Sequence, residues 1–279
     1  MPEDHTPKRL IKTVPTIMGE VLHERMALAF AGIGKAVTSI YRDDPRAERE
    51  GRPEHIGSGV FLKRGNGRFL VTAAHVLDDR KMSRLYFPAG KRLREIEGNA
   101  ISTSAPKGKR KNDRYDFAVV ELDAAVVAAL GNIRYVSEDE FRGIDGDISG
   151  HGLMALGFPV SQNKKIDHAK KQIRPKRLSY GAVALKDASF ALKLGLTGED
   201  HVFVKYEKKS KVASGAVVDS YSPRGMSGGA LIDLGRIGSL FALEGKLDDR
   251  FRVAGILIEY YKAENRMVSV KTETILSVL

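Results

Sequence analysis

The chain consists largely of short apolar and β-branched runs, separated by glycine and turn residues. Such runs are typical of β-strands, and many of them at close spacing favour a sandwich or a pair of barrels over alternating strands and helices. The predicted strands cover residues 36–41, 57–63, 68–73, 84–88, 116–122, 152–157, 178–185, 202–206, 213–219, 230–233, 253–259 and 267–270. This pattern of many short strands therefore indicates an all-β protein made of two packed subdomains.

Helical spacing is found chiefly at the two ends of the chain. Apolar residues recur with a helical period from Ile17 to Phe30, Pro15 suits a first turn, and Gly32 is placed to end the helix. Shorter helices are expected over 123–130 and 272–279. We therefore divide the chain into an N-terminal tail and helix, 1–35, and a β domain, 36–279, with subdomains at about 36–140 and 141–279.

Composition excludes several kinds of chemistry. The chain has no cysteine, which excludes disulfides, a thiol nucleophile, an iron–sulfur cluster and thiolate zinc sites. No apolar run approaches the roughly 20 residues that cross a bilayer, and no charged-then-apolar leader opens the sequence. We expect a cytoplasmic protein that does not bind membranes.

The formal net charge is +11, and the basic residues gather in clusters. They have no interleaved aromatic residues and accompany no helix-turn-helix, RRM or finger pattern. We interpret the clusters as solvated loops and do not expect a nucleic-acid partner. The alternative is a surface that holds an acidic partner or nucleic acid. The clusters lie at residues 107–111, 164–165, 170–171, 174–177 and 205–211.

Three segments carry residues suited to acyl transfer. His75 follows an apolar strand, Asp116 opens another, and Ser227 is enclosed by Gly225, Gly228 and Gly229. A serine hydroxyl needs a base to take its proton, and a buried aspartate fixes the tautomer of that base. Glycines beside the serine let backbone amides converge on an oxyanion. We predict His75, Asp116 and Ser227 as a catalytic triad, with the amides of Gly225 and Ser227 as the oxyanion hole.

The order of the three residues narrows the fold. His–Asp–Ser is the order of chymotrypsin-type barrels, whereas an α/β-hydrolase needs its histidine after the serine, and no histidine follows Ser227. Asp113 is the competing aspartate, but it lies in a lysine-rich loop and is expected to be solvated. The other six histidines show no compact ligand spacing, so we predict no metal and no cofactor.

The blocks Thr72-Ala-Ala-His75, Asp116-Phe-Ala-Val-Val and Gly225-Met-Ser227-Gly-Gly229 resemble the signature segments of trypsin-like serine peptidases, nearest to the bacterial Deg/HtrA-type catalytic domain. The similarity covers roughly residues 36–279. It implies two packed antiparallel six-stranded β-barrels, here with an N-terminal helical extension and a short C-terminal helix.

The sequence also departs from that family. Met226 stands where secreted members carry an aspartate that pairs with a new N-terminus, so activation by that route is not expected. Ala230 replaces the proline that is common after the glycine pair. We expect no PDZ domain after Ser227, so that regulation would need loops, the N-terminal helix or a partner protein.

The resemblance also places the walls of a substrate pocket. They would be formed by Tyr221, Ser222, Arg224, Ile256, Leu257, Ile258 and Glu259. Glu259 would favour a basic side chain if it reached inward, but an exposed strand position is an equal alternative.

We therefore expect a serine endopeptidase that cleaves a restricted protein or peptide substrate, or has a gated site. The alternatives are a catalytically silent binding module for an acidic protein or nucleic acid, and an esterase that uses the same triad.

Overall fold

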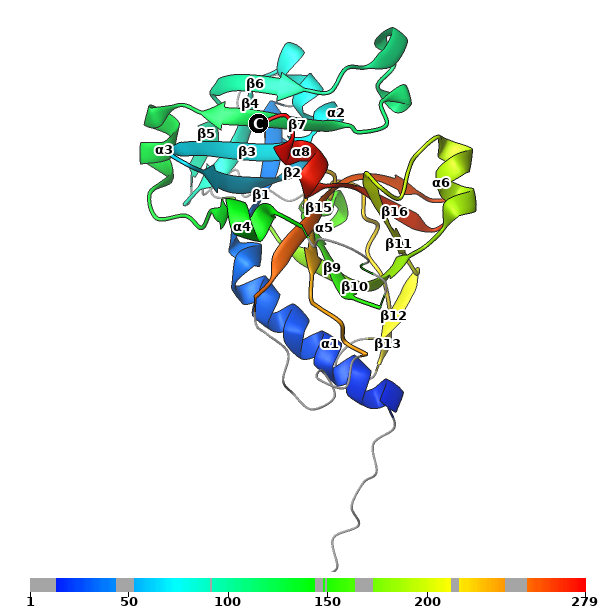
Figure 1. Ribbon diagram of the computed structural model, residues 1–279. Coiled ribbons are helices and arrows are strands. Elements are labelled where there is room, and N and C mark those ends of the chain that lie inside the picture. Colours follow the sequence, from blue (N-terminus) through cyan, green and yellow to red (C-terminus); the bar gives the residue numbers. More distant parts are fainter. Residues whose placement is uncertain are drawn as a thin grey trace, which may run out of the picture.

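The computed structural model describes residues 14–43, 53–90, 92–143, 148, 150–163, 173–211, 216–238 and 250–279. The predicted tail before Val14 and the first part of the predicted strand 213–219 lie outside these residues. Within them, two antiparallel β units lie side by side (Figure 1).

The first unit is an open sheet in the order β5-β4-β1-β2-β3-β7-β6, with β8 added parallel to β2. Alternation along its strands fills two cores, since Val60, Leu62 and Val71 face one cluster whereas Phe61 and Leu70 face another. The strands are β1 (Val37–Asp43), β2 (Pro53–Arg64), β3 (Gly67–Ala73), β4 (Leu85–Ala89), β5 (Arg92–Glu95), β6 (Gly98–Ser102), β7 (Phe117–Leu122) and β8 (Val136–Ser137).

The second unit is a closed barrel in the order β10-β11-β16-β15-β14-β9. Leu153, Val202 and Leu231 belong to a small core of their own, while Leu156 and Ile232 join the large cluster shared with the open sheet. The strands are β9 (Gly152–Gly157), β10 (Leu178–Leu185), β11 (His201–Lys205), β14 (Ala230–Asp233), β15 (Arg252–Tyr261) and β16 (Arg266–Lys271). A separate hairpin pairs β12 (Lys209–Lys211) with β13 (Val217–Asp219).

The predicted N-terminal helix is confirmed as α1, Val14–Ala31, which lies along the barrel (Figure 1). Leu22, Met26 and Phe30 pack against the large core. None of the helices in the described ranges is long and apolar enough to span a membrane. The remaining helices are α2 (Ala74–Asp78), α3 (Ala124–Leu130), α4 (Glu138–Phe141), α5 (Val160–Asn163), α6 (Ala188–Leu194) and α8 (Thr272–Leu276), with single 3-10 turns at Ile33–Ala36, Asp79–Lys81, Pro106–Gly108 and Arg110–Asn112.

The prediction of two closed six-stranded barrels needs one correction. In the described part of the chain no pairing joins β5 to β6, so the first unit stays open. Neither edge strand has a buried side chain, since β5 alternates exposed with half-buried residues and β6 is mostly exposed, Ile101 included. A closed six-stranded barrel beside a curved sheet, with helices at both ends of the chain, is consistent with a trypsin-like fold.

Candidate active site

His75 and Asp116 are held together by the ends of two neighbouring strands. β3 ends at Ala73, and the backbone turns into α2, where the Ala74 amide donates to the Asp116 carbonyl oxygen at 2.8 Å. The His75 amide donates to Asp116 Oδ1 at 2.9 Å, and His75 Nδ1 lies 2.6 Å from Asp116 Oδ2. Asp116 takes a φ of +42°, a conformation that a non-glycine residue adopts at an energetic cost. The two hydrogen bonds between His75 and the Asp116 carboxylate, one from the backbone amide and one at Nδ1, therefore fix the orientation of the imidazole ring.

The pair sets the tautomer and basicity of His75. A carboxylate only accepts, so Nδ1 carries the proton and Nε2 is left as the acceptor. Burial lowers the pKa of His75, but the hydrogen bond and the charge of Asp116 raise it by more, with a further increase from Glu259 and opposition from Arg110. The net result is a pKa above the ordinary histidine value. Such an imidazole is a good proton acceptor.

Ser227 lies in a tight loop between residue 220 and β14. At two glycines of this loop, neighbouring atoms approach so closely that no side chain would fit. Gly225 has a φ of +92°, and a Cβ there would lie 2.7 Å from Val160 Cγ2 and 2.9 Å from the Phe158 oxygen. Gly228 has a φ of +83°, and its Cβ would collide with the Ser58 carbonyl oxygen. The two glycines are thus required by positive φ and by close approach.

Ser58 on β2 anchors this loop to the open sheet. Its amide donates to the Ser227 carbonyl oxygen at 2.8 Å, and its hydroxyl donates to the Gly225 carbonyl oxygen at 2.9 Å. The Phe158 amide in turn donates to the Ser58 hydroxyl at 3.0 Å. Sequence reasoning did not identify Ser58, because a serine in a predicted strand carries no local signal of a long-range contact.

The amides around Ser227 alternate between paired and unpaired. Met226 N donates to the Pro223 oxygen at 2.9 Å, and Gly228 N donates to the Leu257 oxygen at 2.7 Å. Gly225 N and Ser227 N donate to no acceptor in the described residues. Since buried amides are normally paired, two free donors in one turn leave a place for an external oxygen atom.

A cleft of about 490 Å³ contains all three predicted triad residues. His75 and Asp116 lie on the side of the open sheet, and Ser227 lies on the barrel side. No hydrogen bond between Ser227 Oγ and His75 Nε2 occurs in the described structure. Such bonds are commonly long in unliganded enzymes and tighten when substrate binds. The other residues that line the cleft are Ile56, Arg110, Lys111, Asp113, Arg114, Leu196, Pro223, Arg224, Gly225, Ile258, Glu259, Tyr260 and Tyr261.

Only part of the predicted substrate pocket faces this cleft. Arg224, Ile258 and Glu259 line it, and Leu257 and Glu259 line a cavity of about 20 Å³ beside Ser227, which Met226 and Met267 also line. Burial raises the pKa of Glu259, and the charge of Asp116 adds to this, while Tyr261 and His75 oppose it.

Three predicted pocket residues lie elsewhere. Ile256 is fully buried in the core, where it pairs with Ala230 and Val270, so it forms no pocket wall. Tyr221 lines a separate cavity together with Tyr206, and Ser222 is exposed and lines neither the cleft nor the small cavity. The resemblance alone placed these walls, and it does not fix which side chains point into the core; for Ile256 this is set by its pairing with β14 and β16.

Asp113 is engaged elsewhere, although not in the way the sequence indicated. Its side chain is only 4% exposed and pairs with Arg110 at 2.6 Å, and Thr103 also donates to it. Arg110 further bridges both oxygens of Asp78, at 2.8 and 3.0 Å. This network clamps the 103–113 segment to the end of α2, close to His75.

A second His–Asp pair is present in the barrel. His151 Nδ1 lies 2.9 Å from Asp233 Oδ1, both residues are buried, and Arg236 Nε donates to His151 Nε2 at 3.2 Å. With both ring nitrogens engaged, this imidazole has no free acceptor. Sequence spacing did not point to this pair.

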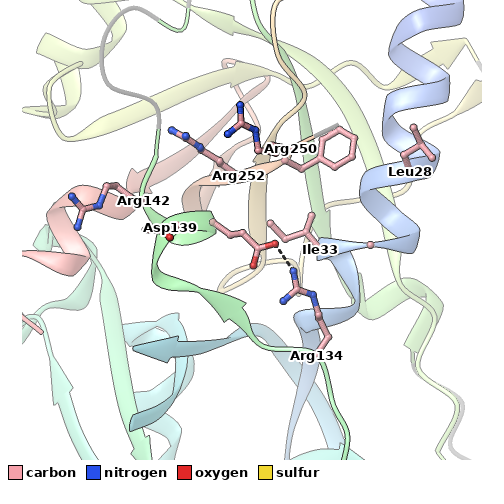
Figure 2. Close-up of a pocket in the computed structure, with 10 residues that line it drawn as sticks. Leu28, Ile33, Arg134, Asp139, Arg142, Arg250 and Arg252 are labelled. Carbon is pink, nitrogen blue, oxygen red and sulfur yellow. Dashed lines mark hydrogen bonds and ion pairs between the residues drawn. The ribbon is translucent and has the colours of Figure 1, made fainter. Parts of the chain in front are cut away.

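A second cavity, of about 720 Å³, lies at the end of α1 and is lined by none of the three predicted triad residues. Figure 2 shows Arg134 paired there with a carboxylate, that of Glu140, below Arg250 and Arg252. Within the described residues, no three His, Asp or Glu side chains are grouped to hold a metal ion.

The sequence matches no protein-family profile and no curated protein. Among solved structures, the serine endoprotease from Yersinia pestis is similar over 90% of this chain and 64% of that chain, with 15% identity and a TM-score of 0.48. The chain thus spans less than two thirds of that protein, and a similarity of this size does not establish the reaction.

Proposed function

We propose that the protein is a serine endopeptidase of the trypsin-like type. The observation that carries this proposal is the cleft itself: an aspartate-bound imidazole and a serine flanked by two unpaired amides face the same space. The proposal assigns Ser227 as nucleophile, His75 as general base, Asp116 as its orienting carboxylate, and Gly225 N and Ser227 N as oxyanion donors.

The reaction follows from these positions. Ser227 Oγ attacks the peptide carbonyl carbon while His75 Nε2 accepts the hydroxyl proton, and Asp116 stabilises the imidazolium. The carbonyl oxygen becomes an oxyanion and accepts from the two free amides. His75 then donates the proton to the leaving amine, and water, activated by the same imidazole, releases the acid from Ser227.

The edge of β15 provides a place for a peptide backbone. β14 pairs with β15 only as far as Ile256, whereas pairing with β16 continues to Tyr261. In the described structure, the other edge of residues 258–261 is therefore open toward the cleft. An extended peptide can add there as a strand, which orients a scissile bond and gives a peptide an advantage over a small ester.

A fluorophosphonate probe tests the nucleophile. We expect the full-length protein to gain one phosphonyl group, mapped to Ser227 by peptide mass spectrometry, and Ser227→Ala to gain none. Ser222→Ala is a matched control, because Ser222 lies in the same loop but lines neither the cleft nor the adjoining small cavity. An unlabelled wild-type protein would overturn the proposal and favour the silent binding module.

Amide and ester panels separate a peptidase from an esterase, since only the former cleaves amides at useful rates. The proposed restricted substrate is sought by comparing protein termini in cells that carry the wild type or Ser227→Ala. A set of termini that requires the hydroxyl is the expected result.

A further inference from the structure

The cleft is lined by three cationic side chains without a counter-ion. Lys111, Arg114 and Arg224 are exposed, and none of them forms a hydrogen bond or ion pair through its side chain in the described structure. The fourth cation, Arg110, is neutralised by Asp78 and Asp113. Lys111, Arg114 and Arg224 can therefore pair with an anionic ligand, whereas Arg110 is already paired.

Most acidic side chains of the same cleft are already paired with a basic residue. Asp113 pairs with Arg110, and Asp116 pairs with His75. Glu259 is the remaining carboxylate among the lining residues, and burial disfavours its charged form. Three unpaired cations against one acid leave the open part of the cleft positive.

Two of the cations are held in place by the fold. The Arg110 network fixes the segment before Lys111 to α2, and Thr103 O accepts from Arg110 at 2.7 Å. On the other side, His201 Nε2 contacts the Arg114 carbonyl oxygen at 2.8 Å, and Gly195 has no side chain where the Arg114 guanidinium rests. The segment thus bridges the open sheet and the barrel, so Lys111 and Arg114 lose little backbone entropy on binding.

Arg224 completes the arrangement from the opposite direction. It directly precedes Gly225, and its carbonyl oxygen accepts from Val160 N at 2.8 Å, which fixes its backbone beside the free amides. The cleft that contains Ser227 is therefore lined by cations from both the 110–114 segment and Arg224.

We propose that the cleft selects protein segments with acidic residues around the reactive bond, with Lys111, Arg114 and Arg224 as specificity-determining residues. The inference rests on the proposed function and names its substrate class. The net charge of +11 would add long-range attraction for such a substrate. A peptide suits the site better than a nucleic acid because the open β15 edge offers backbone pairing to an extended peptide.

Binding to the full-length Ser227→Ala protein tests this inference without any turnover. Three fluorescent peptides of one length carry Glu, Gln or Lys at the same positions, and fluorescence anisotropy gives their affinities. We expect the Glu peptide to bind about tenfold more tightly than the Gln peptide at low salt, and the Lys peptide to bind most weakly. At about 0.5 M salt the preference should shrink to about twofold or less, because exposed charges are screened.

Charge reversals locate the effect. Lys111→Glu with Arg114→Glu should abolish the preference for the Glu peptide. Lys107→Glu with Lys109→Glu makes the same charge change in the same segment, but neither lysine lines the cleft, so the preference should remain. Glu259→Gln should strengthen binding of the Glu peptide about twofold.

The inference is wrong if the three peptides bind equally, or if both double variants weaken the Glu peptide to the same extent. It is also wrong if a single-stranded oligonucleotide of matched length binds more tightly and depends on Lys111 and Arg114. Fluorophosphonate labelling of the wild type reports separately on the proposed reaction. A labelled protein without acidic preference refutes only the substrate class, whereas an unlabelled one with that preference refutes only the peptidase.

Discussion

His55 is a buried histidine whose protonation should govern acid stability. It lies on β2 opposite Tyr41, with ring centroids 5.3 Å apart, and only 5% of the residue is exposed. Neither ring nitrogen has a hydrogen-bond partner in the described structure. Burial lowers the pKa of His55 from 6.5 to about 4, with a smaller opposite effect of the Gly57 backbone.

The sign of the effect follows from proton binding. Between the two pKa values the unfolded chain binds a proton that the folded protein does not, so stability falls as the pH falls below 6.5. The contribution of His55 to this loss is about 2 kcal/mol at pH 5 and about 3 kcal/mol at pH 4.

His55→Phe removes the titrating group and keeps an aromatic ring against Tyr41. Urea unfolding followed by circular dichroism at pH 7, 5 and 4 should show that the variant loses less stability than the wild type by these amounts. Tyr41→Phe keeps the imidazole and should retain the full pH dependence. Equal losses in the wild type and His55→Phe would refute the reasoning.

Three further predictions concern the cleft and its surroundings. Asp116→Asn should slow phosphonylation of Ser227 by about 10³–10⁴-fold. It should also move the acid limb of the pH–rate profile to lower pH, because Asp116 raises the pKa of His75 and the reaction needs the neutral imidazole. An acid limb at the same pH in both proteins would contradict this. Gly228→Ala should destabilise the protein by at least about 2 kcal/mol in urea unfolding and abolish labelling, whereas Gly198→Ala, with open space around it, should do neither. His151→Gln should lower stability by about 1–3 kcal/mol yet leave the labelling rate within about twofold, and a large loss of labelling would show that the second His–Asp pair takes part.

The parts of the fold that depend on local pattern could be predicted from the sequence. The apolar strands of the barrel, the helix α1 and the C-terminal α8 follow from period and breakers, and their predicted ranges overlap the observed ones. The edge strands β5 and β6 were missed because Arg92–Glu95 and Gly98–Ser102 are short and carry one large apolar residue each, Leu93 and Ile101. α6 was not predicted, although Asp187, which caps its first turn, and Gly195, which ends it, are local signals that could have indicated a helix there.

Long-range pairing could not be predicted in the same way. Whether the first sheet closes depends on two exposed edges meeting, which no local pattern records. The contacts of Ser58 with the Ser227 loop and of Arg110 with Asp78 join residues far apart in the chain. Sequence order pointed to His75, Asp116 and Ser227, but only the strand ends explain why the first two meet.

Non-additivity is the most direct test that the serine, the imidazole and the carboxylate work as one unit. Hydrolysis of a reactive ester should be measured for Ser227→Ala, His75→Ala and the double variant, each as full-length protein. Residues that act in one step give a double variant about as slow as either single one. Losses that instead multiply would show that Ser227 and His75 act independently, which contradicts the account.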